Sequence, residues 1–281
     1  MSTNDKKSII SNGESTEPIP VFFVGHGSPM NAIEQNEFTN SWQEIGMIVP
    51  KPKAILCISA HWETRGTRIT AMKKPRTIHD FGGFPQKLYE VEYPAPGNPS
   101  LATEIKGNIK KADVALDESW GLDHGAWSVI RHIYPGADVP VLEMSLDLNR
   151  SPLEHLELAG ELGNLRKKGV LIIGSGNMVH NLGLIAWNRA GDPEYGYDWS
   201  IEASNIFKKL IISGNNKDLA NYKNLGREVQ LAVPSPDHFL PMLYVLGLRK
   251  ENESVSFFND KAIMGSLTMT SFRIGSSHIQ R

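Results

Sequence analysis

The chain has 281 residues, with 29 lysines and arginines against 31 aspartates and glutamates, for a net charge of −2. This length fits one large domain or two small ones, at about 100–200 residues per domain. The absence of a basic surplus argues against a nucleic-acid binder, because no excess charge is available to neutralise phosphates. The apolar runs are far shorter than the roughly 20 residues of a membrane span. The single cysteine, Cys57, excludes an internal disulfide and a Cys-rich zinc module.

The N-terminal segment is polar, and its longest apolar step is Ile9-Ile10. A secretory signal needs an apolar stretch of about 7–15 residues, which this segment lacks. We therefore predict a disordered polar tail over 1–17, one domain over 18–275, a short C-terminal tail over 276–281, and a cytoplasmic location.

Four short runs are continuously apolar, rich in β-branched residues and bounded by glycine or proline. Unbroken hydrophobicity at strand length indicates strands that are buried on both faces, as in a parallel sheet covered by helices. The runs are Val21–Val24, Ala54–Ile58, Val139–Met144 and Val170–Ile173.

Stretches with helical spacing alternate with these runs, which is the pattern of an α/β fold. The stretch Ser151–Lys168 begins with Ser-Pro and has Glu154 three residues on, which is typical of a capping box. The last segments, Ser254–Phe258 and Ser266–Ile274, are predicted as strands added at an edge. The other predicted helices are Phe38–Ile48, Pro99–Lys111, Ala126–Tyr134, Tyr197–Ile212 and Asp237–Leu248. We expect a single α/β domain with a mostly parallel central sheet flanked by helices.

The nine histidines are the unusual feature of the composition, and three of them follow predicted strands. His26, His61 and His180 each come just past the C-terminal end of one of the runs. In open parallel sheets, ligand sites lie in the crevice beyond the carboxyl ends of the strands. We therefore predict that these histidines converge on one site, although 35 and 119 residues separate successive members.

Two further histidines lie at predicted helix starts. In Pro234-Ser235-Pro236-Asp237-His238, Ser235 is a good N-cap and Pro236 a good first helical residue, so His238 is expected in the first turn. The positive end of the helix dipole favours neutral imidazole, the form that binds a metal. His124 has a similar place before Ala126–Tyr134.

The remaining histidines are expected to have ordinary roles, with one exception. His132 falls inside a predicted helix, His155 at an exposed-looking helix start, and His278 in the polar tail. His79 belongs to an aromatic, glycine-rich loop that can line a pocket.

Other catalytic motifs are not supported. Gly174-Ser175-Gly176 follows a strand, but the third glycine of G-x-G-x-x-G is replaced by Val179, and no phosphate-binding G-x-x-x-x-G-K-[ST] occurs. No G-x-S-x-G hydrolase motif is present. Cys57 lies inside an apolar run, which predicts a buried and unreactive thiol.

A histidine-only site suits Zn(II), Fe(II) or another first-row metal, whereas Mg²⁺ and Ca²⁺ prefer oxygen ligands. Three ligands with an open position indicate a catalytic metal, and four closed ligands a structural one. The polar, glycine-rich loops around these histidines favour the open site. A further histidine that is not a ligand can act as acid or base.

At these residues the sequence resembles the class III extradiol ring-cleavage dioxygenases, in particular their 4,5-DOPA dioxygenase branch. The matching motifs follow the order of the family from about residue 20 to residue 275. They are Gly25-His26-Gly27-Ser28-Pro29-Met30, Ser59-Ala60-His61-Trp62, Thr77–Pro85, Asp123-His124-Gly125-Ala126-Trp127, Gly174–Asn181 and Asp237-His238-Phe239-Leu240-Pro241.

The resemblance implies roles for five histidines. His26, His61 and His238 correspond to metal ligands, His180 to a fourth ligand or to the base beside the metal, and His124 to a group near the substrate. The implied reaction is the O₂-dependent opening of a catechol ring next to its two hydroxyls, with both oxygen atoms entering a muconic-type semialdehyde. The expected partners are therefore a small catechol and O₂.

One departure from the family pattern leaves the metal open. Many class III enzymes complete a triad of two histidines and one carboxylate, as in non-heme Fe(II) oxygenases, but here His238 holds the third position. A site of three or four histidines resembles catalytic zinc, and Zn(II) is the expected isolated form, with Fe(II) as the redox-active form. The alternatives are a zinc hydrolase with His180 or His124 as base, and a non-enzymatic binding protein on the same fold.

Four aromatic residues close to these motifs can stack on a substrate ring, and each is also a plausible packing residue. They are Trp62, Phe81, Phe84 and Trp127.

Overall fold

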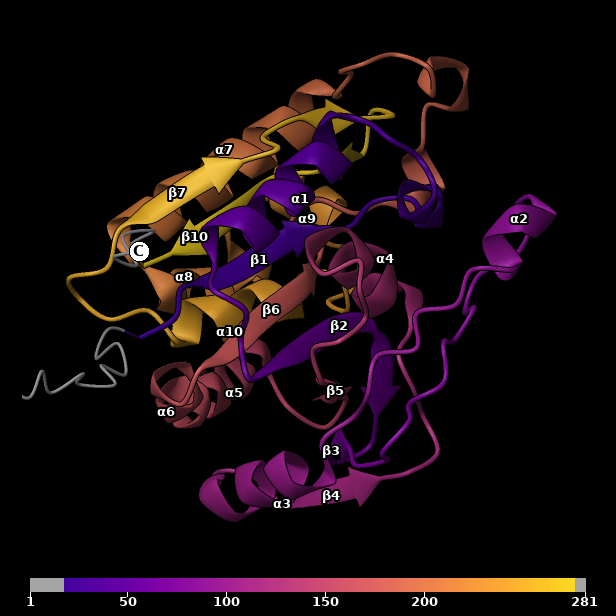
Figure 1. Ribbon diagram of the computed structural model, residues 1–281. Coiled ribbons are helices and arrows are strands. Elements are labelled where there is room, and N and C mark those ends of the chain that lie inside the picture. Colours follow the sequence, from indigo (N-terminus) through magenta and orange to yellow (C-terminus); the bar gives the residue numbers. More distant parts are fainter. Residues whose placement is uncertain (1–17, 276–281) are drawn as a thin grey trace, which may run out of the picture.

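The computed structural model describes residues 18–275, so the tails predicted at 1–17 and 276–281 lie outside the described residues. Eight strands form one sheet in the order β4-β3-β5-β2-β6-β1-β10-β7, with helices on both faces (Figure 1). Its centre is parallel and consists of β1 (Val21–Gly25), β6 (Val170–Gly176), β2 (Ala54–Thr64) and β5 (Val141–Asp147). The four predicted apolar runs lie in these strands, which confirms the α/β fold with a mostly parallel sheet.

The edges of the sheet differ from the prediction. Strand β3 (Thr67–Thr70) is antiparallel to β5, and β4 (Val114–Asp117) is parallel to β3. Neither was predicted, because both are short and contain polar residues. At the other edge, β10 (Ser271–Ile274) is antiparallel to β1 and carries β7 (Val255–Phe258) outside it.

The prediction of one strand over Ser266–Ile274 is wrong. The chain first forms β9 (Leu267–Thr268), which pairs with β8 (Ala262–Ile263) in a separate two-stranded sheet, and only then enters β10. Met264 and Gly265, both with positive φ, turn the chain between β8 and β9 into a hairpin.

Helices cover the two faces of the sheet in separate layers. Because side chains alternate along a strand, Phe22 and Val24 face a layer with α1 (Glu37–Ile48) and α4 (His124–Ile133). Val21 and Phe23 face the opposite core. That second layer contains α3 (Pro99–Asn108), α5 (Pro152–Ala159), α6 (Gly163–Lys167), α7 (Asp198–Ser213), α8 (Asn216–Ala220), α9 (Arg227–Ala232) and α10 (Leu240–Gly247).

The short helix α2 (Gln86–Tyr89) lies at the end of two long arms (Figure 1), and its Leu88 is fully buried in the core on the α1–α4 face. One of these arms carries the segment Thr77–Pro85.

The capping box at Ser151 is confirmed, because its hydroxyl accepts from the Glu154 N–H while the Glu154 carboxylate accepts from the Ser151 N–H at 2.7 Å. The predicted helix over 151–168 has the expected extent, but a 3₁₀ turn over Gly160–Leu162 divides it into α5 and α6.

Two predictions about histidine environments are wrong. The last helix begins at Leu240, because the N–H groups of Phe239 and Leu240 both donate to the Pro236 carbonyl, so His238 lies in a turn before α10. His155 is fully buried, with its Nδ1 2.9 Å from the Tyr244 hydroxyl. None of the helices in the described part of the chain is long and apolar enough to cross a membrane.

Candidate metal centre and active site

The parallel register brings the C-terminal ends of three strands to one level. Gly25 of β1 lies opposite Gly176 of β6, and Ser59 of β2 lies opposite Ser175. His26 directly follows β1. His61 lies inside β2 rather than beyond it, because β2 continues to Thr64 after a register shift against β5 between Ile58 and Glu63.

The predicted convergence is present at this edge. The ring centroid of His26 lies 5.0 Å from that of His61, 5.5 Å from that of His124 and 5.2 Å from that of His238. The ring of His180 stacks on that of His238 with 3.5 Å between centroids. All five histidines singled out in the sequence therefore share one site.

The tautomer of His26 follows from its neighbour Ser175. The Ser175 hydroxyl donates its only proton to the Gly125 carbonyl at 2.6 Å, so toward His26 Nδ1, 3.0 Å away, its oxygen can only accept. His26 therefore carries its proton on Nδ1 and has a bare lone pair on Nε2.

Asp80 performs the same function for His124. Its Oδ2 lies 2.9 Å from Nδ1 of His124 and 3.5 Å from Nδ1 of His61, and its Oδ1 accepts from the His124 backbone N–H at 2.8 Å. Burial alone would raise the pKa of Asp80, but the hydrogen bonds and charge of His124 lower it below its ordinary value. An ionised Asp80 places the proton of His124 on Nδ1 and leaves its Nε2 bare, and its charge also faces Nδ1 of His61.

The Nε2 atoms of His26 and His61 lie 3.1 Å apart. A contact this short is made either by one proton on His61 Nε2 that is donated to the bare Nε2 of His26, or by a cation that both nitrogens bind. Two nitrogens bound to one tetrahedral zinc at about 2.0–2.1 Å are about 3.3 Å apart, close to the observed spacing. The donor set and its geometry therefore fit a first-row metal ion.

Two groups of possible ligands meet here. One consists of His26, His61 and His124, and the other of His180, Asp237 and His238, each with ligand atoms within 4.8 Å of one another. In the second group, the Asp237 carboxylate accepts a hydrogen bond from Nδ1 of His238. That contact and the charge of His238 lower the pKa of Asp237 against the effect of burial.

Their surroundings favour the neutral form of three histidines of the site, His26, His61 and His180. Burial first, and repulsion by the neighbouring imidazoles second, lower the pKa values of His26 and His61 well below the ordinary value. Burial likewise lowers the pKa of His180 to about 3, with a further contribution from His238. Neutral imidazole is the form that binds a metal and accepts a proton.

Of the four aromatic candidates, Phe81 contacts the histidines. Its ring meets that of His124 edge-on with 5.5 Å between centroids, and it also contacts Phe84. Trp62 stacks on Trp120, and Trp127 is fully buried with its indole N–H donating to the Ile78 carbonyl, so both are packing residues.

His79 belongs to the same arm as Phe81. Its Nε2 lies 2.9 Å from the Val91 carbonyl, and its ring meets those of Phe81, Tyr89 and Trp127. It therefore packs within the aromatic loop, one residue away from Asp80.

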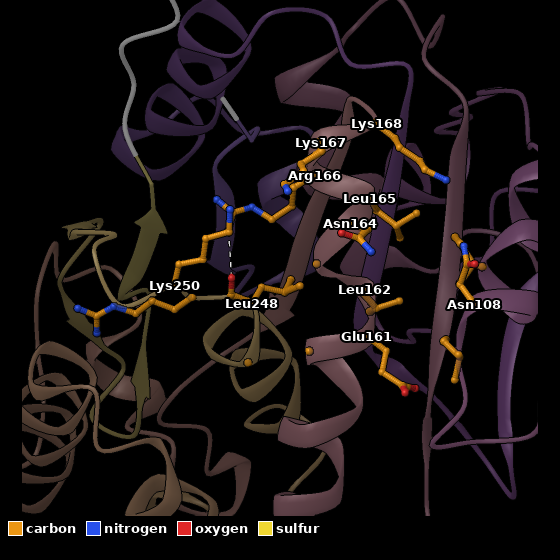
Figure 2. A pocket seen from close by; sticks show the side chains of 16 residues that line it. Asn108, Glu161, Leu162, Asn164, Leu165, Arg166, Lys167, Lys168, Leu248 and Lys250 are labelled. Atoms are coloured by element: carbon orange, nitrogen blue, oxygen red, sulfur yellow. Dashed lines mark hydrogen bonds between the residues drawn. The ribbon is translucent and has the colours of Figure 1, made fainter. Parts of the chain in front are cut away.

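A hollow of about 680 Å³ lies elsewhere, between the C-terminal ends of α3, α6 and α10 (Figure 2). Because α6 ends at Lys167, just before β6 begins, this hollow lies at the amino end of the parallel strands, opposite the histidines. Its buried Arg166 donates to the Leu248 carbonyl at 3.0 Å and to Glu253, and Lys168 pairs with Glu104. The charges of Arg166 and Lys168 are therefore already paired within the protein.

Sequence reasoning missed Asp80 and Ser175 as partners of the histidines. Asp80 lies inside the matched motif Thr77–Pro85, so the motif contained a signal that attention to histidines alone overlooked. Ser175 acts across two strands and becomes visible only once the β1–β6 register is known.

Residues 19–269 match the family model of the catalytic LigB subunit of aromatic ring-opening dioxygenases. The chain belongs to the LigB family. A 4,5-DOPA dioxygenase extradiol of Escherichia coli K12 is 44% identical over 93% of this chain and 96% of its own length. The Beta vulgaris protein of the same name is 34% identical over 91% of this chain and 96% of its own length.

A crystal structure of an uncharacterized Escherichia coli K12 protein has the same fold. It superposes with a TM-score of 0.77 at 37% identity and covers 92% of this chain and 100% of its own. The resemblance to class III extradiol dioxygenases, and to their 4,5-DOPA branch, is therefore confirmed for this LigB-family chain.

Proposed function

We propose that this LigB-family protein is an extradiol dioxygenase that opens a catechol ring, such as that of DOPA, with O₂ at a single divalent metal. The observation that carries the proposal is the close approach of the Nε2 atoms of His26 and His61, 3.1 Å apart at the carboxyl edge of the sheet. The family match and the catechol-cleaving names of the relatives support the reaction class.

We assign His26, His61 and His238 as the metal ligands. The centroid of the His238 ring lies 4.9 Å from that of His61 and 5.2 Å from that of His26, and Asp237 holds its Nδ1. The metal supplies the Lewis-acid and redox chemistry that the reaction of O₂ with a catechol requires. We infer Fe(II) as the redox-active form and Zn(II) as the form present after purification.

The stacking of His180 on His238 favours a base over a fourth ligand. Their planes are within 7° of parallel and their centroids 3.5 Å apart. Two rings stacked face to face in this way would not both direct a nitrogen lone pair at one ion, so His238 would hold the metal and His180 would stay free of it. His180 can instead accept a proton from a catechol hydroxyl as a neutral imidazole.

We place His124 on the substrate side of the metal. It is buried, its Nδ1 is held by Asp80, its ring centroid lies 4.0 Å from that of His61, and Phe81 meets its ring edge-on. There it can hold or accept the proton of the second catechol hydroxyl while Phe81 excludes water from the reacting ring.

The test is oxygen uptake by protein loaded anaerobically with Fe(II) and mixed with DOPA. We expect uptake together with a yellow ring-opened product, and both should disappear in His26→Ala and His61→Ala. His238→Ala should lose the metal, whereas His124→Ala should keep it and lose turnover. Absence of oxygen uptake with a panel of catechols under Fe(II) loading would remove the proposal.

A zinc hydrolase is the second candidate, because a donor set of histidines alone is also that of catalytic zinc. A panel of esters, amides and phosphoesters with Zn(II)-loaded protein tests it. Hydrolysis that depends on His26, without oxygen uptake in the Fe(II) form, would favour this candidate. A binding protein without activity predicts that neither assay responds. The cytoplasmic location stays a prediction from the sequence.

A further inference from the structure

We propose that Asp80 is a positioning residue that fixes the tautomer of His124, so that Nε2 of this ring reaches the substrate as a proton acceptor. The inference rests on the proposed function, in which His124 lies on the substrate side of the metal. It concerns a carboxylate on the arm that leads to α2, outside the set of histidines assigned above.

The geometry of the contact is specific for a carboxylate. Both oxygens of Asp80 accept from one residue, Oδ1 from the His124 backbone N–H at 2.8 Å and Oδ2 from its Nδ1 at 2.9 Å. A carboxylate can only accept hydrogen bonds, so Nδ1 must carry the proton and Nε2 must carry the lone pair. Second partners of this kind set the orientation and basicity of a histidine ring.

The arm that carries Asp80 is anchored to the segment that carries His124. The Ile78 N–H donates to the Leu122 carbonyl at 2.7 Å, and the Leu122 N–H donates to the Arg76 carbonyl at 2.8 Å. Trp127, one turn into α4, donates its indole N–H to the Ile78 carbonyl at 2.8 Å. These three hydrogen bonds therefore fix the position of Asp80 relative to His124.

The same carboxylate also lies close to a second histidine of the site. Its Oδ2 also lies 3.5 Å from Nδ1 of His61, a proposed metal ligand. One side chain thus orients a ligand and the substrate-side histidine together. Movement of the arm would displace both rings, and Phe81, the next residue, would leave the edge of His124 with it.

A merely structural role is the alternative. His124 is the first residue of α4, whose first N–H groups have no partner within the helix, and Oδ1 of Asp80 accepts one of them. If this were the only role, loss of Asp80 would lower stability without changing which ring nitrogen of His124 carries the proton.

The decisive substitution is Asp80→Asn, which keeps the shape but leaves one acceptor. If the amide oxygen keeps the His124 backbone N–H, the amide NH₂ faces Nδ1 and forces the proton onto Nε2. Asp138→Asn is the matched control, because Asp138 is exposed and pairs with Lys51 at the surface.

The direct readout is the ¹⁵N spectrum of the histidine rings in metal-free protein, with the His124 signals assigned from His124→Gln. We expect an Nδ1–H tautomer of His124 in the wild type and in Asp138→Asn, and an Nε2–H tautomer in Asp80→Asn. An Nε2–H tautomer in the wild type would overturn the proposal without any variant, as would an unchanged tautomer in Asp80→Asn.

The kinetic readout uses the Fe(II)-loaded enzyme. We expect Asp80→Asn to lower kcat by about 10²- to 10⁴-fold, the range of general acid–base catalysis, with the KM for the catechol changed less than about three-fold. A loss confined to KM would overturn the proposal. The ring spectrum does not require turnover, so a wild type without oxygen uptake but with the expected tautomers would refute the proposed function and leave the role of Asp80 standing.

Discussion

Gly176 is the residue at which a single methyl group should disturb the metal centre most selectively. It ends β6, and the next residue, Asn177, donates its N–H to the His238 carbonyl at 2.9 Å. A Cβ at Gly176 would lie 2.2 Å from that carbonyl oxygen. Because Gly176 does not have positive φ, Gly176→Ala tests this close approach alone and adds no backbone strain.

The magnitude follows from the required displacement. An ordinary contact between a methyl carbon and an oxygen needs about 3.2–3.4 Å, so the turn that carries His238 must retreat by about 1 Å. Metal–nitrogen distances tolerate only about 0.2 Å. We therefore expect metal affinity to fall by about 10- to 100-fold, as when the support of a ligand is lost, and stability to fall by about 1–3 kcal/mol from overpacking.

The assay is a competition titration of metal-free protein with a chelating zinc indicator, with urea unfolding measured in parallel. Gly107→Ala is the matched control, because a Cβ at Gly107 in α3 meets no atom within 4 Å. Zinc affinity within two-fold of the wild type in a folded Gly176→Ala variant would refute the reasoning, since His238 would then not need its present position to bind the metal.

Three further predictions concern other parts of the molecule. Burial lowers the pKa of His155 to about 4 from an ordinary 6.5, so the unfolded chain binds the proton first as pH falls, and stability should decrease between pH 6.5 and 4 by up to about 3 kcal/mol. His155→Gln should flatten this part of a pH series of urea unfolding curves, and an unchanged slope would contradict it. Glu253→Gln leaves the buried Arg166 facing a neutral amide and should lower the free energy of unfolding by about 2 kcal/mol. A free energy of unfolding in urea equal to that of the wild type would disprove this. Phe81→Leu removes the ring that meets His124 edge-on and should raise the KM for a catechol by about 2- to 10-fold while metal affinity is retained. Loss of the metal in this variant would contradict a role of Phe81 at the substrate.

The central sheet could be predicted from local hydrophobic patterns because its strands are buried on both faces. Runs such as Val170–Ile173 have no polar interruption, and the crossover helices between them leave few alternatives to a parallel sheet. The edge elements were not predictable in this way. Strand β3 has only four residues, and all but Ile69 are polar or charged. Strand β9 is held by the hairpin at Met264 and Gly265 rather than by its own sequence.

The part of the site that lies at the ends of the central strands could be predicted from the sequence. His26 and His61 follow apolar runs whose ends must meet in a parallel sheet, so their convergence needed no long-range information. The assignment of tautomers needed contacts that sequence spacing does not encode. Ser175 reaches His26 across the sheet, and Asp80 reaches His124 from an arm 44 residues earlier in the chain.

The most direct test of the account is the fate of the two oxygen atoms. Fe(II)-loaded protein should be mixed with DOPA under ¹⁸O₂, and the mass of the trapped product should be measured by mass spectrometry. The account predicts a ring-opened product that carries two ¹⁸O atoms, with one O₂ consumed per catechol, and no such product from His61→Ala. A product with no ¹⁸O, or ring opening that persists without O₂, would contradict it.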